Sequence, residues 1–410
     1  MANTSTIHIK TDFDCIVYDY DQEIGNTKAD TYTNFELRKG EHELTFEYIS
    51  SISISKTINY VVEDADCDYR LVVEIVDVIY KEAIGLSKGL EYYFLEEAYC
   101  LFMKAAEKGY SKAQNSCGDC YKNGIGVEKD FKKAVEWYNK AAMQGNAAAQ
   151  CNLGLCYQYG NGVKEDYAKA IEYYVKAVEQ NYADAQYHLG FCHKYGFGVE
   201  RNLGKAAELY TKATEQGHEM AQYELGCCYN YGEGVEKDLE KAVVWYAKAG
   251  EQGHASAQNE LGHCYQYGNG VNKNLSKAVE WYTKAANQGN RYAQNSLGIC
   301  YEYGEGVEKD LAKAVELYTK AAEQGSATAQ CNLGVCYYLG QGIEKDLKKA
   351  VNWFQESAVR CYARAQYNLG VCYENGKGIE KDLTKAIDWY TKAAEQGCED
   401  AQRALDRLKP

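Results

Sequence analysis

The segment AQNSLGICYEYGEGVEKDLAKAVELYTKAAEQG, residues 293–325, predicts two short helices joined by a glycine turn. Apolar or small residues recur at helical spacing in each half, as on one buried face of a helix. Gly304 tolerates the left-handed backbone that ends a helix. Asp310 is a favourable N-cap for a second helix, which continues to Gly325. The segment is therefore a helix-turn-helix unit.

Nearly the same unit recurs along most of the chain. A Leu-Gly pair returns every 36 residues, with its leucine at positions 153, 189, 225, 261, 297, 333 and 369. Cys117-Gly118 is a weaker copy, and Leu405 begins a final half-copy. One helical pair cannot bury its apolar face alone, so neighbouring units must stack into a continuous core. The repeat predicts an α/α superhelix, that is, an α-solenoid of 36-residue helix-turn-helix units.

The recurring pattern A-Q-x-x-L-G-x-C-Y-x-x-G-x-G-V-x-K-D resembles the Sel1-like repeat, a relative of the tetratricopeptide repeat, over residues 95–410. This resemblance implies a non-enzymatic scaffold or adaptor that binds a protein or peptide partner in a concave groove. It implies no catalytic residue and no cofactor. We expect the repeat domain to occupy residues 79–410.

Residues 1–78 have a different pattern, which predicts a small all-β, sandwich-like domain. Alternation of apolar and polar residues marks CIVYDY, HELTFEYI, SISISKTINYVV and YRLVVEIV, while QEIGNTKAD and RKGEH read as turns. The pieces IVYDYDQEIG and ELRKGEHELTFEY are weakly similar to PEGA-type β modules of bacterial proteins. An unrelated β module remains the alternative, and its acidic pairs lack the order of an EF-hand calcium loop.

The charge distribution argues against a nucleic-acid partner. The chain has a net charge of −14, and residues 1–80 hold 16 acidic and 6 basic side chains. Nucleic-acid binders need a basic surface instead.

The first residues lack the apolar core of a signal peptide, and no apolar run approaches the ~18 residues of a membrane span. We therefore expect a cytoplasmic protein that does not insert into membranes. The sequence does not indicate its oligomeric state. Export by a non-standard route stays an alternative.

The cysteines read as core residues. Eight repeat at the 36-residue step: Cys120, Cys156, Cys192, Cys228, Cys264, Cys300, Cys336 and Cys372. Equivalent positions in packed helices lie about 8–10 Å apart, which is too far for a disulfide. In a secreted, cysteine-rich branch of the resembled family, two cysteines per repeat bridge the helices, and that branch is associated with β-lactam binding. The second helix here supplies no periodic cysteine, so reduced buried thiols are expected.

Two functions remain as alternatives to the scaffold. One is an exported effector that binds a host protein, and the other is a β-lactam-binding or hydrolysing enzyme. No metal motif emerges from the seven histidines. The Gly-x-Gly of each unit follows a helix rather than a strand, and its middle residue varies to Glu233 and Glu305. It is therefore interpreted as a hinge and not as a phosphate-binding loop.

Partner-binding residues should differ from one repeat to the next, while the residues that form the two helices of the repeat stay the same. Two slots on the first helix of each unit satisfy this, one directly after Ala-Gln and one seven residues later, and Asn, Gln and Tyr there suit contacts with a peptide. The groove candidates are Asn115, Lys122, Gln158, Tyr187, Lys194, Tyr223, Asn230, Asn259, Gln266, Asn295, Glu302, Tyr338, Tyr367 and Glu374. An ordinary solvated helix face is the alternative. A changed helix end is also expected near Cys361, where other units have Gly.

Overall fold

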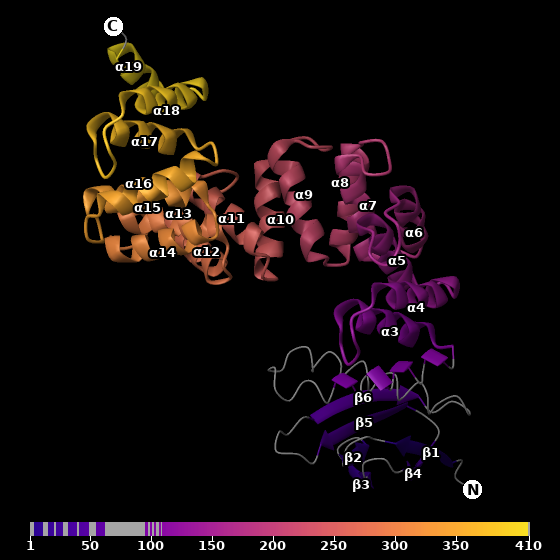
Figure 1. The fold of residues 1–410 in the computed structure, drawn as a ribbon. Helices are drawn as coiled ribbons and strands as arrows, with labels where there is room; N and C mark the ends of the chain where they lie inside the picture. Colours follow the sequence, from indigo (N-terminus) through magenta and orange to yellow (C-terminus); the bar gives the residue numbers. More distant parts are fainter. Residues whose placement is uncertain are drawn as a thin grey trace. The chain divides into compact units, whose positions relative to one another are not determined.

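The computed structural model describes residues 111–408 throughout, together with six strands between residues 4 and 61 and short helical stretches at 95–96, 99–100, 102–103 and 106–107, followed by residues 109–110. The chain divides into two compact units, residues 1–201 and 202–410, which are described separately (Figure 1). The predicted boundary between residues 78 and 79 lies outside the described residues, as does the predicted strand YRLVVEIV.

The N-terminal strands form two antiparallel sheets. The strands are β1 (Thr4–Lys10), β2 (Cys15–Asp19), β3 (Gln22–Thr27), β4 (Tyr32–Arg38), β5 (Glu41–Tyr48) and β6 (Ser55–Val61). One sheet pairs β1 with β4, and the other has the order β3-β2-β5-β6. The interpretation of QEIGNTKAD as a turn was wrong for its first six residues, because Gln22–Thr27 is an edge strand that, among the described residues, pairs with β2. Such a strand needs no buried alternating face. The sandwich and the PEGA-type resemblance stay predictions.

Residues 111–408 form 17 helices in tandem pairs, which make an α-solenoid fold (Figure 1). The first helices are α3 (Ser111–Asn123), α5 (Ala147–Tyr159), α7 (Ala183–Tyr195), α9 (Glu219–Tyr231), α11 (Ala255–Tyr267), α13 (Arg291–Tyr303), α15 (Ala327–Leu339), α17 (Ala363–Asn375) and the terminal α19 (Glu399–Leu408). The second helices are α4 (Phe131–Met143), α6 (Tyr167–Glu179), α8 (Leu203–Glu215), α10 (Leu239–Glu251), α12 (Leu275–Asn287), α14 (Leu311–Glu323), α16 (Leu347–Ala358) and α18 (Leu383–Glu395).

The ends of the helices follow the predicted capping residues. Gly304 has φ 74° and its N–H donates to Cys300 O, which closes the first helix. Asp310 Oδ1 accepts the N–H of Lys313 at 3.0 Å and opens the second. Gly306 also has positive φ, and a Cβ there would collide with the backbone of Leu275 in the preceding unit. Both glycines of the hinge are therefore required, one for helix ending and one for close packing.

In most repeats the two helices meet where an aromatic ring packs on a glycine. The glycine of the Leu-Gly pair faces a fully buried tyrosine of the second helix at Gly154, Gly226, Gly262, Gly298 and Gly370, and Gly334 faces Phe354 instead. A Cβ built on Gly262 would lie 2.5 Å from the ring of Tyr282, and one on Gly298 would lie 2.6 Å from that of Tyr318. The ring thus occupies the volume that any side chain would need, and the helices approach closely because Cβ is absent. The recurring cysteines are buried beside this contact, as predicted.

Glutamines join each unit to the next. Gln258 Nε2 donates to Gly250 O of the preceding unit at 2.8 Å, and Gln258 Oε1 accepts from Gln288 Nε2 at 2.8 Å. A buried amide is satisfied on both sides, as such groups must be. The corresponding pairs of side chains are Gln144–Gln114, Gln180–Gln150, Gln252–Gln222, Gln324–Gln294 and Gln396–Gln366.

The unit of α15 and α16 breaks this rule. Arg360 stands where the other units have the donating glutamine, and the buried Gln330 Oε1 has no hydrogen-bond partner. Helix α16 is also one residue shorter than the other second helices, and Cys361 is held at φ 60°. The predicted change of helix end near Cys361 is confirmed. Asn181, the other replacement of the terminating glycine, has φ 59°.

We expect Gly262→Ala to lower the free energy of unfolding by about 1–3 kcal/mol, because the new methyl group overpacks against Tyr282. Urea unfolding followed by circular dichroism measures the change. Gly204→Ala is the matched control, since its Cβ would meet only Asn202 Oδ1 at 3.5 Å and Gly234 O at 3.9 Å. That variant should be neutral or stabilised by up to about 1 kcal/mol through helix propensity. Equal destabilisation by both changes would contradict this account.

We expect Arg360→Gln to raise the free energy of unfolding by about 1 kcal/mol, because it supplies the missing donor to Gln330 Oε1. The comparison variant Arg360→Met removes the same charge and brings no donor. If both variants stabilise the protein equally in urea titrations, the stabilisation comes from the lost arginine and not from the restored hydrogen bond.

Candidate functional site

The later of the two predicted slots is largely occupied by contacts inside the repeat. Tyrosine hydroxyls of the second helices donate to its residues at 2.6–2.7 Å. The acceptors are Gln158, Gln266, Glu302 and Glu374. Gln158 and Gln266 are 3% and 8% exposed, so these amides lie in the packed interior and not on an open surface. Glu374 also binds Arg407 with both carboxylate oxygens, at 2.7 and 2.8 Å.

The earlier slot links neighbouring first helices. Asn115 Oδ1 accepts from Asn152 Nδ2 of the next unit at 3.0 Å, and Asn295 Oδ1 accepts from Asn332 Nδ2 at 3.0 Å. Tyr187, Asn259 and Asn295 are buried. Asn259 differs from the other two asparagines of this slot, because its buried Oδ1 has no hydrogen-bond partner.

The remaining groove candidates are half-buried against neighbours. Tyr223 stacks on His254, Tyr338 packs on Phe354 and Tyr367 on Tyr390. Lys122 pairs with Asp119 at 3.9 Å, and the Nζ of Lys194 lies 5.6 Å from the ring centroid of Tyr195. Asn230 is also half-buried. A role of these fourteen residues in partner binding stays a prediction, and most of their side chains already have contacts within the protein.

A row of exposed aromatic residues lies one position beyond the later slot, at the last residue of the first helix. We call it the tyrosine row, and Leu339 is its one residue that is not a tyrosine. It consists of Tyr159 and Tyr195 in the compact unit of residues 1–201, and of Tyr231, Tyr267, Tyr303 and Leu339 in that of residues 202–410. The tyrosines are 50–66% exposed and Leu339 is 53% exposed. This row was not among the predicted site residues, although the sequence has a large residue, usually a tyrosine, at 36-residue intervals directly before a helix-ending glycine. A solvated helix end has no need of such a residue.

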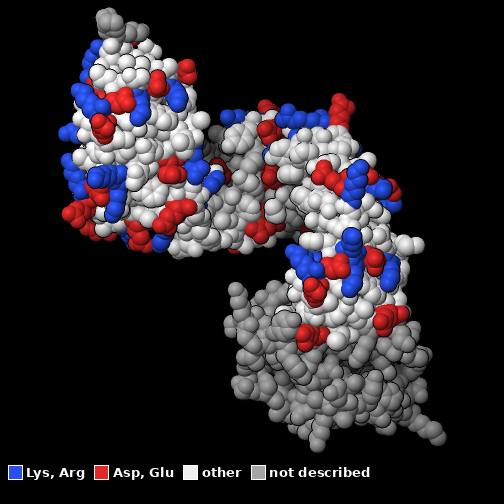
Figure 2. Space-filling view, viewed as in Figure 1, with Lys and Arg blue, Asp and Glu red and all other residues white. Residues whose placement is uncertain are grey.

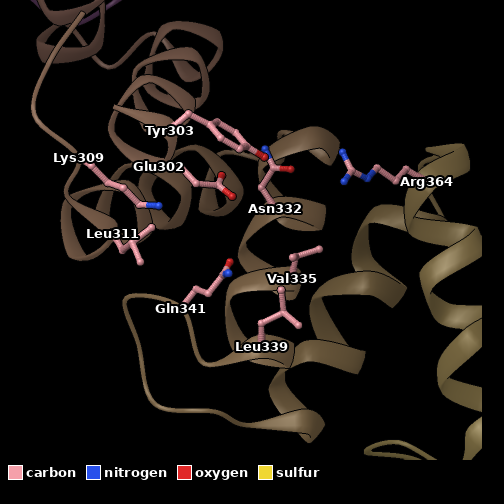
Figure 3. A pocket seen from close by; sticks show the side chains of 9 residues that line it. All are labelled: Glu302, Tyr303, Lys309, Leu311, Asn332, Val335, Leu339, Gln341 and Arg364. Atoms are coloured by element: carbon pink, nitrogen blue, oxygen red, sulfur yellow. The ribbon is translucent and has the colours of Figure 1, made fainter. Parts of the chain in front are cut away.

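The tyrosine row borders a cavity of about 300 Å³ in the second unit. Glu302 and Tyr303 come from α13, Asn332, Val335 and Leu339 from α15, and Arg364 from α17 (Figure 3). Three successive first helices therefore share one surface. The carboxylate of Glu302, more than burial, raises the pKa of the Tyr303 phenol, while Arg364 opposes this shift. The lining of the cavity thus combines apolar side chains with groups of both charges.

The described residues offer little to a metal or to covalent chemistry. They contain no group of three His, Cys, Asp or Glu side chains placed to hold a metal ion. Burial raises the pKa of the core thiols, to about 11 for Cys300, so these cysteines are poor nucleophiles at neutral pH. On the face seen in Figure 2, Lys and Arg are interspersed with Asp and Glu. Across the helices described, none is long and apolar enough to cross a membrane.

Histidine caps two first helices in the second unit. His254 Nδ1 accepts the N–H of Ala257 at 3.1 Å, and His218 Nδ1 does the same for Ala221. Asn146 and Asn290 perform this task elsewhere in the chain. Only a neutral imidazole nitrogen can accept, and a charged ring would face the positive helix end. Burial lowers the pKa of His254, against the opposing charges of Glu219 and Glu224.

Because the pKa of His254 is lower in the folded protein than in the unfolded chain, its contribution to stability is present above about pH 6.5 and is lost as the pH falls below that value. His254→Asn should remove part of the stability difference between pH 7.5 and pH 5, by about 1 kcal/mol. Urea titrations at both pH values measure the effect. An unchanged pH dependence in the variant would show that this cap is not a source of acid sensitivity.

Comparison with known proteins identifies the repeat. The family model described as Sel1 repeat matches residues 111–146, 147–182, 183–218, 219–254, 255–290, 291–326, 327–358 and 363–398. The unmatched residues 359–362 include Arg360 and Cys361, where the glutamine link is missing. Comparison with curated protein sequences found no match.

Two solved structures share the fold and much of the sequence. One is a protective antigen present in uropathogenic Escherichia coli strains, with 38% identity, TM-score 0.68, and coverage of 83% of this chain and 72% of that one. The other is a Sel1 repeat protein from Oxalobacter formigenes, with 32% identity, TM-score 0.56, and coverage of 75% and 90%. With eight matched repeats and these likenesses, the chain belongs to the Sel1 repeat family.

Proposed function

We propose that this chain is a non-enzymatic scaffold that binds a peptide or protein partner along the tyrosine row. Sel1-repeat proteins generally mediate protein–protein interactions, which supports this class of function. The observation that carries the proposal is the exposure of Tyr231, Tyr267 and Tyr303 on neighbouring first helices. Large aromatic side chains left open on a rigid frame are the usual anchors of protein interfaces.

The constancy of the frame supports a binding role as well. The contact of a glycine with an aromatic ring and, outside the repeat of α15 and α16, the glutamine links hold the first helix against its own second helix. A tyrosine immobilised at a helix end loses little conformational entropy on binding. Side chains that vary around the row then select the partner, whereas the row itself supplies contact area.

The proposal places the scaffold in the cytoplasm. Among the described residues the cysteines form no disulfides, which suits a reducing cytoplasm. The likeness to a protective antigen supports a second candidate, an exported protein that contacts a host protein. The β-lactam-binding alternative has no such support here, because its helix-bridging disulfides have no counterpart among the described cysteines.

A photo-reactive amino acid at Tyr267 tests the scaffold function in cells of the source organism. We expect cross-links to a protein partner that mass spectrometry identifies reproducibly. The matched control is the same amino acid at Val244, which is 52% exposed on the adjacent second helix α10. Equal recovery of the same proteins from both positions, or none from Tyr267, would count against binding along the tyrosine row.

A further inference from the structure

The cavity between α13 and α15 lies where the preceding repeat has a direct contact. There, Gln266 Nε2 of α11 donates to Glu305 Oε2 of the next hinge at 3.2 Å. The corresponding pair in the following repeat is Glu302 on α13 and Gln341 in the hinge after α15. Both of these side chains are described and line the cavity of about 300 Å³, and no hydrogen bond joins them. A contact between repeats is thus replaced by an open space of the size of a small ligand site.

Two residues that depart from the repeat pattern border this space. The tyrosine row has Leu339 here, and a leucine side chain is smaller than that of a tyrosine. The second residue of α17 is Arg364, where the two preceding first helices have Tyr292 and Thr328. Both Leu339 and Arg364 line the cavity (Figure 3). Side chains that differ between repeats can give one repeat a function of its own, and here two of them meet at one cavity.

Two cations reach the cavity from different elements. Lys309 lies in the hinge before α14 and Arg364 on α17, and both side chains are exposed (Figure 3). With the residues that the structure describes, neither forms a hydrogen bond or an ion pair, although Glu302 lines the same cavity. The Glu302 carboxylate instead accepts the hydroxyl of Tyr318 at 2.6 Å. The lining therefore carries two cations against one carboxylate, and the N–H donors of both cations are available to a ligand.

We propose that this cavity binds an extended acidic segment of a partner protein, with an aspartate or glutamate carboxylate on the guanidinium group of Arg364. This inference rests on the proposed scaffold function and names the chemistry of its partner. An arginine side chain holds a carboxylate through two parallel, charge-assisted hydrogen bonds. Lys309 attracts a second acidic residue of the same segment, while Val335 and Leu339 offer apolar contact to its methylene groups.

The side-chain amides of the lining suit the main chain of such a segment. Asn332 Nδ2 donates to Asn295 Oδ1 at 3.0 Å, which leaves Asn332 Oδ1 as an acceptor. Gln341 offers an amide donor from the hinge on the other side of α15. A peptide group carries one N–H and one carbonyl, so it can pair with both amides at once. An inorganic anion would use only the cations, and therefore the lining favours a peptide.

The test uses the full-length protein and a fluorescent nine-residue peptide of alternating glycine and aspartate, blocked at both ends and followed by fluorescence anisotropy. We expect saturable binding that weakens between about 50 and 200 mM NaCl, because the contacting charges are screened. The comparison peptides have asparagine or lysine in place of every aspartate. The asparagine peptide keeps the shape and loses the charge, so it should bind more weakly, and the lysine peptide should not bind.

Three variants locate the site. Arg364→Gln should weaken binding of the aspartate peptide about threefold to fivefold, the usual size for one exposed ion pair. Val335→Phe changes no charge and should also weaken binding, because the larger ring fills the cavity, and Phe191 already occupies this position of the repeat. Arg403→Gln is the control for Arg364→Gln, because it removes the same charge from α19, where Arg403 pairs with Asp400. It should leave binding unchanged.

The inference is overturned if the aspartate peptide fails to bind at millimolar concentration, if the asparagine peptide binds equally, or if either Arg364→Gln or Val335→Phe behaves as Arg403→Gln does. These results are separable from the scaffold function. Partner cross-links from Tyr267 without binding of the aspartate peptide would leave the scaffold standing and remove only the preference for an acidic segment.

Discussion

The packing of an aromatic ring, usually that of a tyrosine, on a glycine is the contact on which the repeats depend. In the repeat of Gly262, the ring of Tyr282 fills the place of a side chain on the first helix, and its hydroxyl then reaches Gln266 and His263. The same contact therefore sets the distance between the helices and orients the polar groups at their edge. Close approach of two helices generally requires small residues at the crossing point, and here a single hydrogen atom in place of a side chain supplies it.

This contact explains which surface of the repeat is available. In four repeats the hydroxyl of the buried tyrosine donates to the residue just before the last residue of the first helix, so that position faces the interior of the repeat. The next residue points past the ring into solvent, and there the chain places Tyr231, Tyr267 and Tyr303. In the repeats of Tyr267 and Tyr303, a buried and an exposed tyrosine thus belong to one helical pair but have opposite roles.

The sequence predicted the repeat architecture well because its signals are local. The ends at Gly304 and Asp310, the buried cysteines and the altered turn at Cys361 all follow from neighbouring residues. The functional slots were harder to predict. Whether Gln158 is exposed depends on Tyr174, 16 residues away on another helix, and no periodicity reveals that hydrogen bond. The strand Gln22–Thr27 was missed for a related reason, since an edge strand is defined by its partner and not by its own pattern.

The glutamine link has a consequence for how such a chain can change in length. In the second unit, Gln258, Gln294 and Gln366 each bind a main-chain carbonyl of the preceding repeat and a glutamine of their own repeat. A segment of 36 residues excised or duplicated between such joints would meet the same acceptors on both sides. Unequal recombination could therefore add or remove a rung without redesigning an interface. A duplication of the repeat that contains Arg360 would also copy the buried Gln330 Oε1, which has no hydrogen-bond partner. Selection for stability would therefore disfavour duplication of that repeat.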